Sequence, residues 1–237
     1  MSSGLYIATA GAIAQSNALD ATANNVANAS TVGFHGDRVA FREALGKARS
    51  VDTALVDGGT ASVDQQQGAM TQTENPLDLA LEGDGYFGVN TAQGPRYTRA
   101  GNLQIDDSRN LVTADGMTMR GDGGAPISIP PEAKNVSVAT DGTVSADGQQ
   151  VGKLELARFA PSQLRREGGT LYAAAGKPIE GDPPKVHSGV LEASNVNVVR
   201  GVVDLVKVSR TYESLMRVIQ NYHDVESRAA RELGGPK

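Results

Sequence analysis

The sequence predicts an α+β protein in which long helices at the two ends of the chain pair as a coiled-coil-like domain, with a central antiparallel β-rich domain of many short strands between them. Three observations carry this prediction. Apolar residues recur at heptad spacing near both termini, short apolar runs separated by turn residues fill the middle, and six Asp-Gly pairs punctuate it. With four Phe, six Tyr and no Trp, we expect no large aromatic core.

Residues 1–34 are predicted to form the N-terminal helix and its end. This segment contains a single charged side chain, Asp20. Spacings of three and four residues alternate along one face, whose members are Leu5, Ala8, Ala12, Gln15, Leu19, Thr22 and Val26. Many Asn, Ser and Thr residues make the helix marginal in isolation, so it needs a partner. Short polar side chains and a glycine in Asn28–Gly33 predict its end.

Residues 35–70 are predicted to form an extended connector, and residues 71–185 are predicted to form the central β-rich domain. Asp-Gly pairs favour tight hairpin turns, because glycine adopts positive φ without strain. The expected strands are the apolar runs 79–81, 86–89, 103–105, 127–129, 136–138 and 154–156.

Residues 186–237 are predicted to form a return limb and the C-terminal helix, with Ser194 or Asn195 as its N-cap. Its heptad positions are Val198, Gly201, Leu205, Val208, Tyr212, Leu215, Ile219 and Tyr222. The apolar faces of the two helices are the predicted assembly interface. Its members are Leu5, Ala8, Ala12, Leu19, Val26, Leu205, Val208, Tyr212, Leu215, Ile219 and Tyr222.

Charge and composition disfavour several partners. The 22 basic and 27 acidic residues give a net charge of −5, which offers no basic surface for nucleic acid or anionic lipid. Without cysteine there are no disulfides, thiolate nucleophiles or sulfur ligands for zinc. No apolar run approaches the roughly 18 residues of a membrane span, so we expect no membrane insertion. The first residues lack the layout of a secretory signal, so we expect that any export does not use the general pathway.

Motifs for catalysis or cofactor binding give little support for an enzyme. Residues 83–88 match G-x-G-x-x-G, but no helix is expected after them, so we interpret the match as a turn between strands. The three histidines, His35, His187 and His223, lie in different segments and make a poor metal set. We therefore expect no catalytic residues, no cofactor and no metal.

One enzymatic alternative stays open, a secreted β-rich carbohydrate-active enzyme. Such an enzyme would use paired carboxylates, for which Asp106 with Asp107 or Glu180 with Asp182 are the candidates. Acidic loop residues among turns are the favoured interpretation of these pairs.

Four blocks occur in order along most of the chain: 23–34, 75–87, 97–103 and 191–197. They resemble the signature blocks of the bacterial flagellar rod and hook proteins. His35 stands where that family usually has lysine, and Arg109 where a glycine often precedes the run 110–112. The residues that carry the resemblance are Asn24, Asn25, Asn28, Thr31, Gly33, Phe34, Asn75, Pro76, Leu77, Asp78, Gly83, Gly85, Thr98, Arg99, Gly101, Ser194, Asn195 and Asn197.

This resemblance implies a structural subunit of the flagellar basal-body rod, the axial drive shaft that crosses the periplasm. It implies export in an unfolded state through the flagellar type III apparatus, followed by assembly with copies of itself and with other axial proteins. Terminal helices would line the inner tube, with the β domain outside. The length and the tail at 212–219 favour a proximal rod member, with a distal rod member as the alternative. A self-contained helical hairpin in a monomeric protein remains a further alternative.

Overall fold

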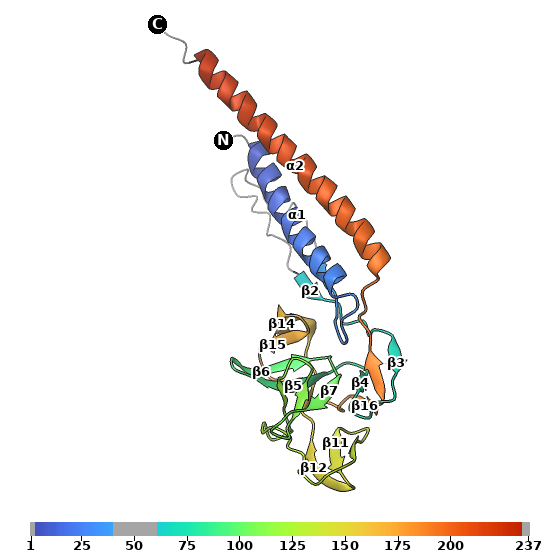
Figure 1. Cartoon of the computed structure of the whole chain (residues 1–237). Coiled ribbons are helices and arrows are strands. Elements are labelled where there is room, and N and C mark those ends of the chain that lie inside the picture. The colour runs from blue at the N-terminus through green and yellow to red at the C-terminus, as the bar shows by residue number, and fades with distance from the viewer. Residues whose placement is uncertain (1–2, 40–60, 234–237) are drawn as a thin grey trace. The chain divides into compact units, whose positions relative to one another are not determined.

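The computed structural model describes residues 3–39 and 61–233 and shows an α+β protein with a β-rich centre (Figure 1). The described residues divide into two compact units. The helical unit contains residues 3–27, 37–39, 61–62 and 197–233, and the β unit contains residues 28–36 and 63–196. The predicted domain boundaries at 34, 70 and 185 stay predictions. Much of the predicted connector, residues 40–60, lies outside the described residues.

The helical unit is built on α1 (Ser3–Ala27) and α2 (Val198–Leu233), which lie side by side and antiparallel (Figure 1). At 1.5 Å per residue they are about 38 and 54 Å long. Gly4 near the start of α1 lies against Tyr222, and Val26 near its end lies against Gly201. The helix α1 ends at Ala27, where the short polar residues of Asn28–Gly33 take over as turns.

A short sheet follows the end of α1. It pairs β1 (Asp37–Val39) with β2 (Ala61–Val63). The amide of Asn25 on α1 makes two hydrogen bonds to the backbone of Asp37: its Nδ2 donates to the carbonyl oxygen, and its Oδ1 accepts from the N–H, both at 2.8 Å. This paired contact fixes the start of β1 against the last turns of α1.

The β unit contains antiparallel sheets. The largest has the strand order β14-β15-β6-β5-β9-β8-β7, and β13 pairs with β5 beside that path. Its strands are β5 (Tyr86–Thr91), β6 (Gly94–Thr98), β7 (Leu103–Ile105), β8 (Leu111–Thr113), β9 (Thr118–Met119), β13 (Leu156–Ala157), β14 (Leu164–Gly168) and β15 (Leu171–Ala174). A 3-10 helix, η2 (Pro161–Gln163), precedes β14.

Three smaller sheets complete the β unit. One has the order β10 (Val136–Val138), β11 (Thr143–Ala146) and β12 (Gln149–Lys153). The other two pair β4 (Leu79–Glu82) with β16 (Lys185–Ser188), and β3 (Met70–Gln72) with β17 (Val190–Glu192). These last two pairings join the beginning of the unit to its end.

The core of the β unit is mainly aliphatic. The larger cluster is centred on fully buried side chains such as Leu79, Leu81, Phe87 and Leu111. A smaller cluster contains two edge-to-face aromatic pairs, Tyr86 with Tyr172 and Tyr97 with Phe159. A larger aliphatic cluster beside a small aromatic one agrees with the low aromatic content of the sequence.

Most of the predicted strands occur, but the run 127–129 is not one. Ile127 and Ile129 are buried in the core, yet the run makes one isolated bridge, between Ser128 and Asn110, and no ladder. Pro126 and Pro130 flank it, and proline has no N–H to donate to a ladder, which explains the error. In the run 154–156 only the last residue belongs to a strand, β13.

The turn predictions are confirmed in two places. Residues 83–85 of the G-x-G-x-x-G match connect β4 to β5, as expected. Asp147 and Gly148 form the two-residue loop between β11 and β12, with φ of 48° and 83°. Positive φ at both positions is the requirement of a type I′ hairpin turn, which Asp-Gly meets well.

None of the described helices combines the length and the apolar character needed to cross a membrane.

Candidate functional site

The predicted assembly interface lies on α1 and α2, and one copy of the chain covers it unevenly. On α1, Leu5, Ala8 and Ala12 are buried, whereas Leu19 and Val26 are half-buried. On α2 the predicted members are half-buried or more exposed: Leu205, Val208, Tyr212, Leu215 and Ile219 are half-buried, and Tyr222 is 37% exposed. The α2 side of the interface is therefore incompletely covered within the chain.

Glycines set the close contacts between the two helices. A Cβ on Gly4 would lie 2.5 Å from the Tyr222 hydroxyl oxygen, and one on Gly201 would lie 2.7 Å from a Val26 methyl group. Leu215 approaches Gly11 at ordinary contact distance. The predicted heptad positions include Gly201 on α2 but neither Gly4 nor Gly11 on α1. Heptad positions are recognised by apolar side chains, and glycine has none. The prediction also missed buried Ala14 and Ala18, which lie one residue off the predicted positions.

Further apolar side chains on the helices face solvent. On α2 they include Val198, Val199, Val202, Val203 and Val206, which we call the valine face, and farther along the helix Val218 and Val225. Their spacing places most of them on one side of the helix.

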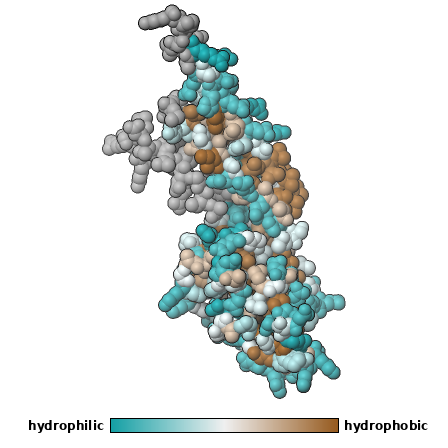
Figure 2. Space-filling model, turned by 60° about the vertical axis from the view of Figure 1, so that its left-hand side comes forward, coloured by the Kyte–Doolittle hydropathy of each residue, from teal (hydrophilic) through white to brown (hydrophobic). Residues whose placement is uncertain are grey.

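Exposure of the valine face is large for side chains of this type, and Val199 is 76% exposed. On α1, Tyr6, Ile7 and Ile13 are each more than half exposed. Figure 2 shows hydrophobic patches on the visible side of the helical unit. Exposed apolar side chains that lie together are typical of surfaces that bind another protein.

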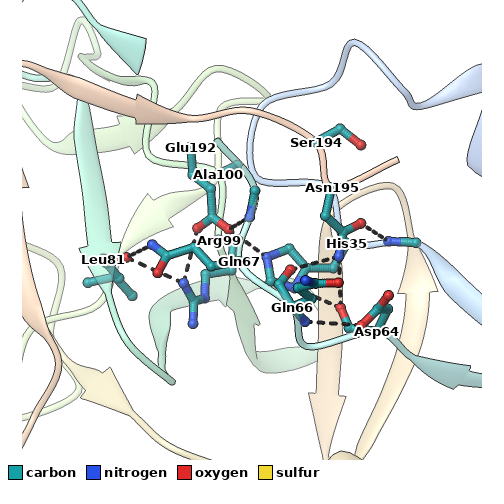
Figure 3. Close-up of polar contacts among 12 residues, drawn as sticks. His35, Asp64, Gln66, Gln67, Leu81, Arg99, Ala100, Glu192, Ser194 and Asn195 are labelled. Atoms are coloured by element: carbon teal, nitrogen blue, oxygen red, sulfur yellow. Dashed lines mark hydrogen bonds and ion pairs between the residues drawn. The ribbon is translucent and has the colours of Figure 1, made fainter. Parts of the chain in front are cut away.

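A second candidate site is a buried polar cluster in the β unit, centred on Glu192 of β17 (Figure 3). Its side chain is fully buried. Oε1 accepts hydrogen bonds from His35 Nε2 at 2.8 Å and from the Gly68 N–H at 2.9 Å, and Oε2 accepts one from Arg99 Nη1 at 3.0 Å. Burial raises the pKa of Glu192, but the bonds from His35, Arg99 and Gly68 outweigh burial and lower it overall.

Arg99 and His35 also contact backbone carbonyl oxygens. Arg99 Nη2 donates to the Gly83 carbonyl oxygen at 2.6 Å, and its guanidinium lies 5.4 Å from the centre of the Tyr86 ring. His35 is fully buried, and its Nδ1 lies 3.0 Å from the Asp64 carbonyl oxygen. These contacts compensate for part of the hydration that the two polar side chains lose on burial.

Asn195 joins the same three chain segments a few residues away. Its Oδ1 accepts from the Gly36 N–H at 2.8 Å, and its Nδ2 donates to the carbonyl oxygens of Asp64 at 3.1 Å and Gln66 at 2.8 Å (Figure 3). The Gly33 N–H donates to the Glu192 carbonyl oxygen at 2.8 Å. Segments 33–36, 64–68 and 192–195 are thereby fastened to one another.

Three of the four signature glycines, Gly33, Gly85 and Gly101, lie where a side chain would collide with a neighbour, whereas Gly83 has open space but a φ of 87°. Gly33 has a φ of 66°, and a Cβ there would lie 2.3 Å from the Arg99 carbonyl carbon. A Cβ on Gly101 would lie 1.8 Å from the Leu79 carbonyl oxygen, and one on Gly85 would lie 2.5 Å from Pro184. These positions let backbone segments approach closely, which is what glycine permits.

Polar signature residues mainly hold turns. Asn75 accepts from the Leu77 N–H at 3.1 Å and donates to Asp78 Oδ1 at 3.0 Å. The Thr98 hydroxyl accepts from the Ala100 N–H at 3.0 Å.

The remaining signature residues have these places. Asn24 and Asn28 flank the end of α1, Thr31 bonds to Asn28, Phe34 is fully buried, and the Pro76 carbonyl accepts from the Ser188 hydroxyl.

The N-cap of α2 differs from the prediction. Asn197, and neither Ser194 nor Asn195, caps the helix, since its Oδ1 accepts from the Arg200 N–H at 3.0 Å. Ser194 instead accepts from the Val196 N–H, and Asn195 is engaged in the polar cluster. Both residues are used before the helix begins at Val198.

The residues considered for metal binding or catalysis are dispersed. Among residues 3–39 and 61–233, no three His, Cys, Asp or Glu side chains come together as a metal site. His187 pairs with Glu82 at 2.9 Å, and His223 is exposed on α2. Asp106 accepts from the Asn110 N–H at 2.7 Å within a turn, and Asp107, Glu180 and Asp182 are exposed.

Comparisons with known proteins match nearly the whole chain. Three family descriptions match successive parts: "Flagella basal body rod protein" at residues 5–35, "Flagellar hook protein FlgE/F/G D1 domain" at 80–146 and "Flagellar basal body rod FlgEFG protein C-terminal" at 187–232.

Whole proteins named for the flagellar rod are also similar to the chain. The chain is 36% identical to the flagellar basal-body rod protein FlgF of Escherichia coli, covering 98% of this chain and 99% of that protein. It is 30% identical to FlgF of Rhizobium meliloti over the full length of both. It is 33% identical to FlgG of Bacillus subtilis, over 87% of this chain and 90% of that protein.

Proposed function

The chain belongs to the family of flagellar basal-body rod proteins, and we propose that it is a structural subunit of the rod that assembles through α1 and α2. The single observation that carries the assembly surface is the incomplete cover of α2 in one copy. Its predicted interface residues are half-buried at best, and the valine face beside them is exposed.

Burial of this surface supplies the driving force for assembly. Fully burying a valine or leucine side chain contributes roughly 1.5–3 kcal/mol. The α1 helix carries one charged side chain, Asp20, so crowded copies of it repel one another little. We propose that the interface comprises the predicted residues of both helices and extends to the valine face.

The contacts between α1 and α2 support coiled-coil-like packing. Gly201 meets Val26, Gln15 donates to the Val208 carbonyl oxygen at 3.4 Å, and Leu215 meets Gly11. These pairs run in antiparallel order along the two helices, and Gly11 lies one residue before the predicted position Ala12. In this proposal, α1 and α2 pair within one copy, and neighbouring copies pack against the paired helices.

We favour a proximal rod subunit of the FlgF type. Relatives named FlgF match over the full length of this chain, and the FlgG alternative fits no better. Partners in this proposal are copies of the chain and neighbouring axial proteins.

Export through the flagellar type III apparatus is part of the same proposal. Helices that are marginal alone stay unfolded during passage through a channel and fold when neighbours cover them. The carboxylates of the enzymatic alternative hold a turn or lie exposed in loops, so a catalytic role gains no support.

Motility of cells that lack their own copy of the gene tests the proposal. Val203→Asp places a carboxylate on the valine face. The Val203 side chain is 48% exposed, so the carboxylate stays hydrated in the free chain. We expect normal secretion of this variant and no swimming. Thr211→Asp, at an exposed polar position of α2, is the matched control and should swim. Normal swimming of Val203→Asp cells would refute the assembly surface.

A further inference from the structure

The polar cluster around Glu192 contains a buried histidine, His35, whose protonation state follows from its hydrogen-bond partners. Both nitrogens of the His35 ring face oxygen atoms: Nε2 faces Glu192 Oε1 at 2.8 Å, and Nδ1 faces the Asp64 carbonyl oxygen at 3.0 Å (Figure 3). A carbonyl oxygen can only accept a hydrogen bond, so Nδ1 must carry a proton to bond with it.

Whether His35 Nε2 also carries a proton depends on whether Glu192 is ionised. Its carboxylate receives the Arg99 guanidinium on one oxygen and the Gly68 N–H on the other, and these donors favour the ionised form. An ionised carboxylate accepts and does not donate, so Nε2 must also carry a proton. In either neutral tautomer, one nitrogen lone pair would face an oxygen within a fully buried site. The geometry therefore calls for a positively charged, doubly protonated ring.

The charged groups around His35 come from four segments. Glu192 is the anion that it contacts, and Arg99 lies on the far oxygen of that carboxylate. Arg166 of β14 donates to the His35 carbonyl oxygen and lies over the Phe34 ring. The Asp64 carboxylate accepts from the Gln66 N–H at 3.1 Å, while its carbonyl faces the ring.

One further titratable group borders the cluster. Burial raises the pKa of Tyr86, so this neighbour of Arg99 remains neutral over the physiological range. His35 is therefore the side chain of the cluster whose two hydrogen bonds depend on how many protons its ring carries.

We propose that His35, Glu192 and Arg99 form a proton-dependent latch that fastens segment 28–36 to the rest of the β unit. With the ring doubly protonated, both of its hydrogen bonds are made and the segment is held. When the ring loses one proton, a buried lone pair faces an oxygen, and the segment gains freedom by leaving the site. The latch is independent of the proposed rod function, because all of its residues lie within the β unit.

A site that prefers the charged ring stabilises the closed latch at acidic pH, and this stabilisation is lost as the pH rises. Opening should expose the amides that the closed latch protects, including the Gly33 N–H bonded to the Glu192 carbonyl and the Gly36 N–H bonded to Asn195.

The protonation state is tested by ¹⁵N NMR of the histidine rings in the full chain at pH 6. With only three histidines in the sequence, His187→Gln and His223→Gln assign the other two rings and leave His35 unaltered. We expect protons on both His35 nitrogens. A His35 ring with one bare nitrogen, in a chain whose segment 28–36 is protected from exchange, would overturn the proposal.

The latch itself is tested by hydrogen exchange of the full chain between pH 6 and pH 9, expressed as protection relative to the intrinsic exchange rate. Linkage to one proton predicts that protection of segment 28–36 falls by up to about tenfold per pH unit. The hairpin 143–153, which contains no histidine, is the internal control. His35→Lys keeps a positive charge and should remove the pH dependence.

Two results would overturn the latch. One is protection of segment 28–36 in the native chain that does not fall with pH relative to hairpin 143–153. The other is an equal fall in His35→Lys. The first comparison uses the unmodified chain, so it decides the matter even if the lysine variant folds poorly.

Discussion

The two units of this chain differ in how completely one copy buries its apolar residues. In the β unit, Leu79, Leu81 and Phe87 have no exposed surface, and strands from its beginning and end pair with each other. In the helical unit, every predicted interface residue of α2 keeps some exposure, and Val199 is 76% exposed. The β unit buries its large apolar side chains within the chain, whereas the helical unit leaves apolar side chains of α2 exposed.

This difference teaches how a subunit can be stable and ready for assembly at once. Burial energy scales with the apolar area removed from water, so the β unit obtains most of its share when the chain folds. The helical unit obtains only part of its share, and we propose that contacts with neighbouring copies supply the remainder. Substitutions in the two units should accordingly disturb different properties of the protein.

The largest expected effect is on the stability of the β unit. In Gly101→Ala, the added Cβ would lie 1.8 Å from the Leu79 carbonyl oxygen, so the backbone must move in the core. We expect a loss of at least about 4 kcal/mol in the free energy of unfolding, measured by urea denaturation. Gly123→Ala, whose Cβ meets nothing within 4 Å, is the control and should change little. Equal stability of both variants would mean that this close approach is absent.

A second substitution should damage assembly and spare the β unit. Leu215→Asp places a carboxylate at a half-buried position of α2 that contacts α1. We expect secretion and the melting temperature of the β unit to be nearly unchanged, and swimming to stop. Ser214→Asp, at the neighbouring exposed position, should be tolerated better. A drop of several degrees in the melting of the β unit would show that the two units are not separable in this way.

Hydrogen exchange of the free chain should show the same contrast in a graded form. Amides of α1 and α2 should exchange much faster than those of β4 and β5, because local opening costs less free energy where fewer apolar side chains are buried. Exchange measured by mass spectrometry at low protein concentration tests this expectation. Slow exchange throughout both helices of a proven monomer would favour the self-contained helical hairpin instead.

Sequence patterns were sufficient for the two helices and for a minority of the strands. Heptad spacing located α1 and α2, and apolar runs located β4, β5, β7 and β10, because both patterns follow from which side chains must be buried. They failed at Ile127–Ile129, where flanking prolines prevent a ladder although the residues are buried. Strands rich in small or polar residues, such as β12, carry too weak an alternation to be recognised.

The polar cluster was not predictable in the same way. Arg99 stood out as a signature residue and His35 as a departure, but nothing local to Glu192 announces a fully buried carboxylate. Its partners lie 93 and 157 residues away along the chain, at Arg99 and His35. Only the fold brings them together, and periodicity carries no information on pairings of that range.

The smallest expected effect is a pH dependence at one hairpin of the β unit. The N–H groups of Asn135 and Lys134 donate to the Asp147 carboxylate at 2.9 and 3.1 Å and lower its pKa. A lowered pKa in the folded state stabilises the fold above the ordinary aspartate value of about 4, and this contribution is lost as the pH falls through the lowered value. Asp147→Asn keeps a residue that tolerates the positive φ but removes the charge.

We therefore expect Asp147→Asn to melt slightly below the native chain at pH 7 and together with it near pH 2, in thermal scans followed by circular dichroism. The comparison between the two proteins isolates Asp147, because every other carboxylate is shared. Asp107→Asn, at an exposed turn position of the same unit, controls for removal of one negative charge. A gap between the native chain and Asp147→Asn that stays constant from pH 7 to pH 2 would show that the hairpin is held by the shape of the side chain and not by its charge.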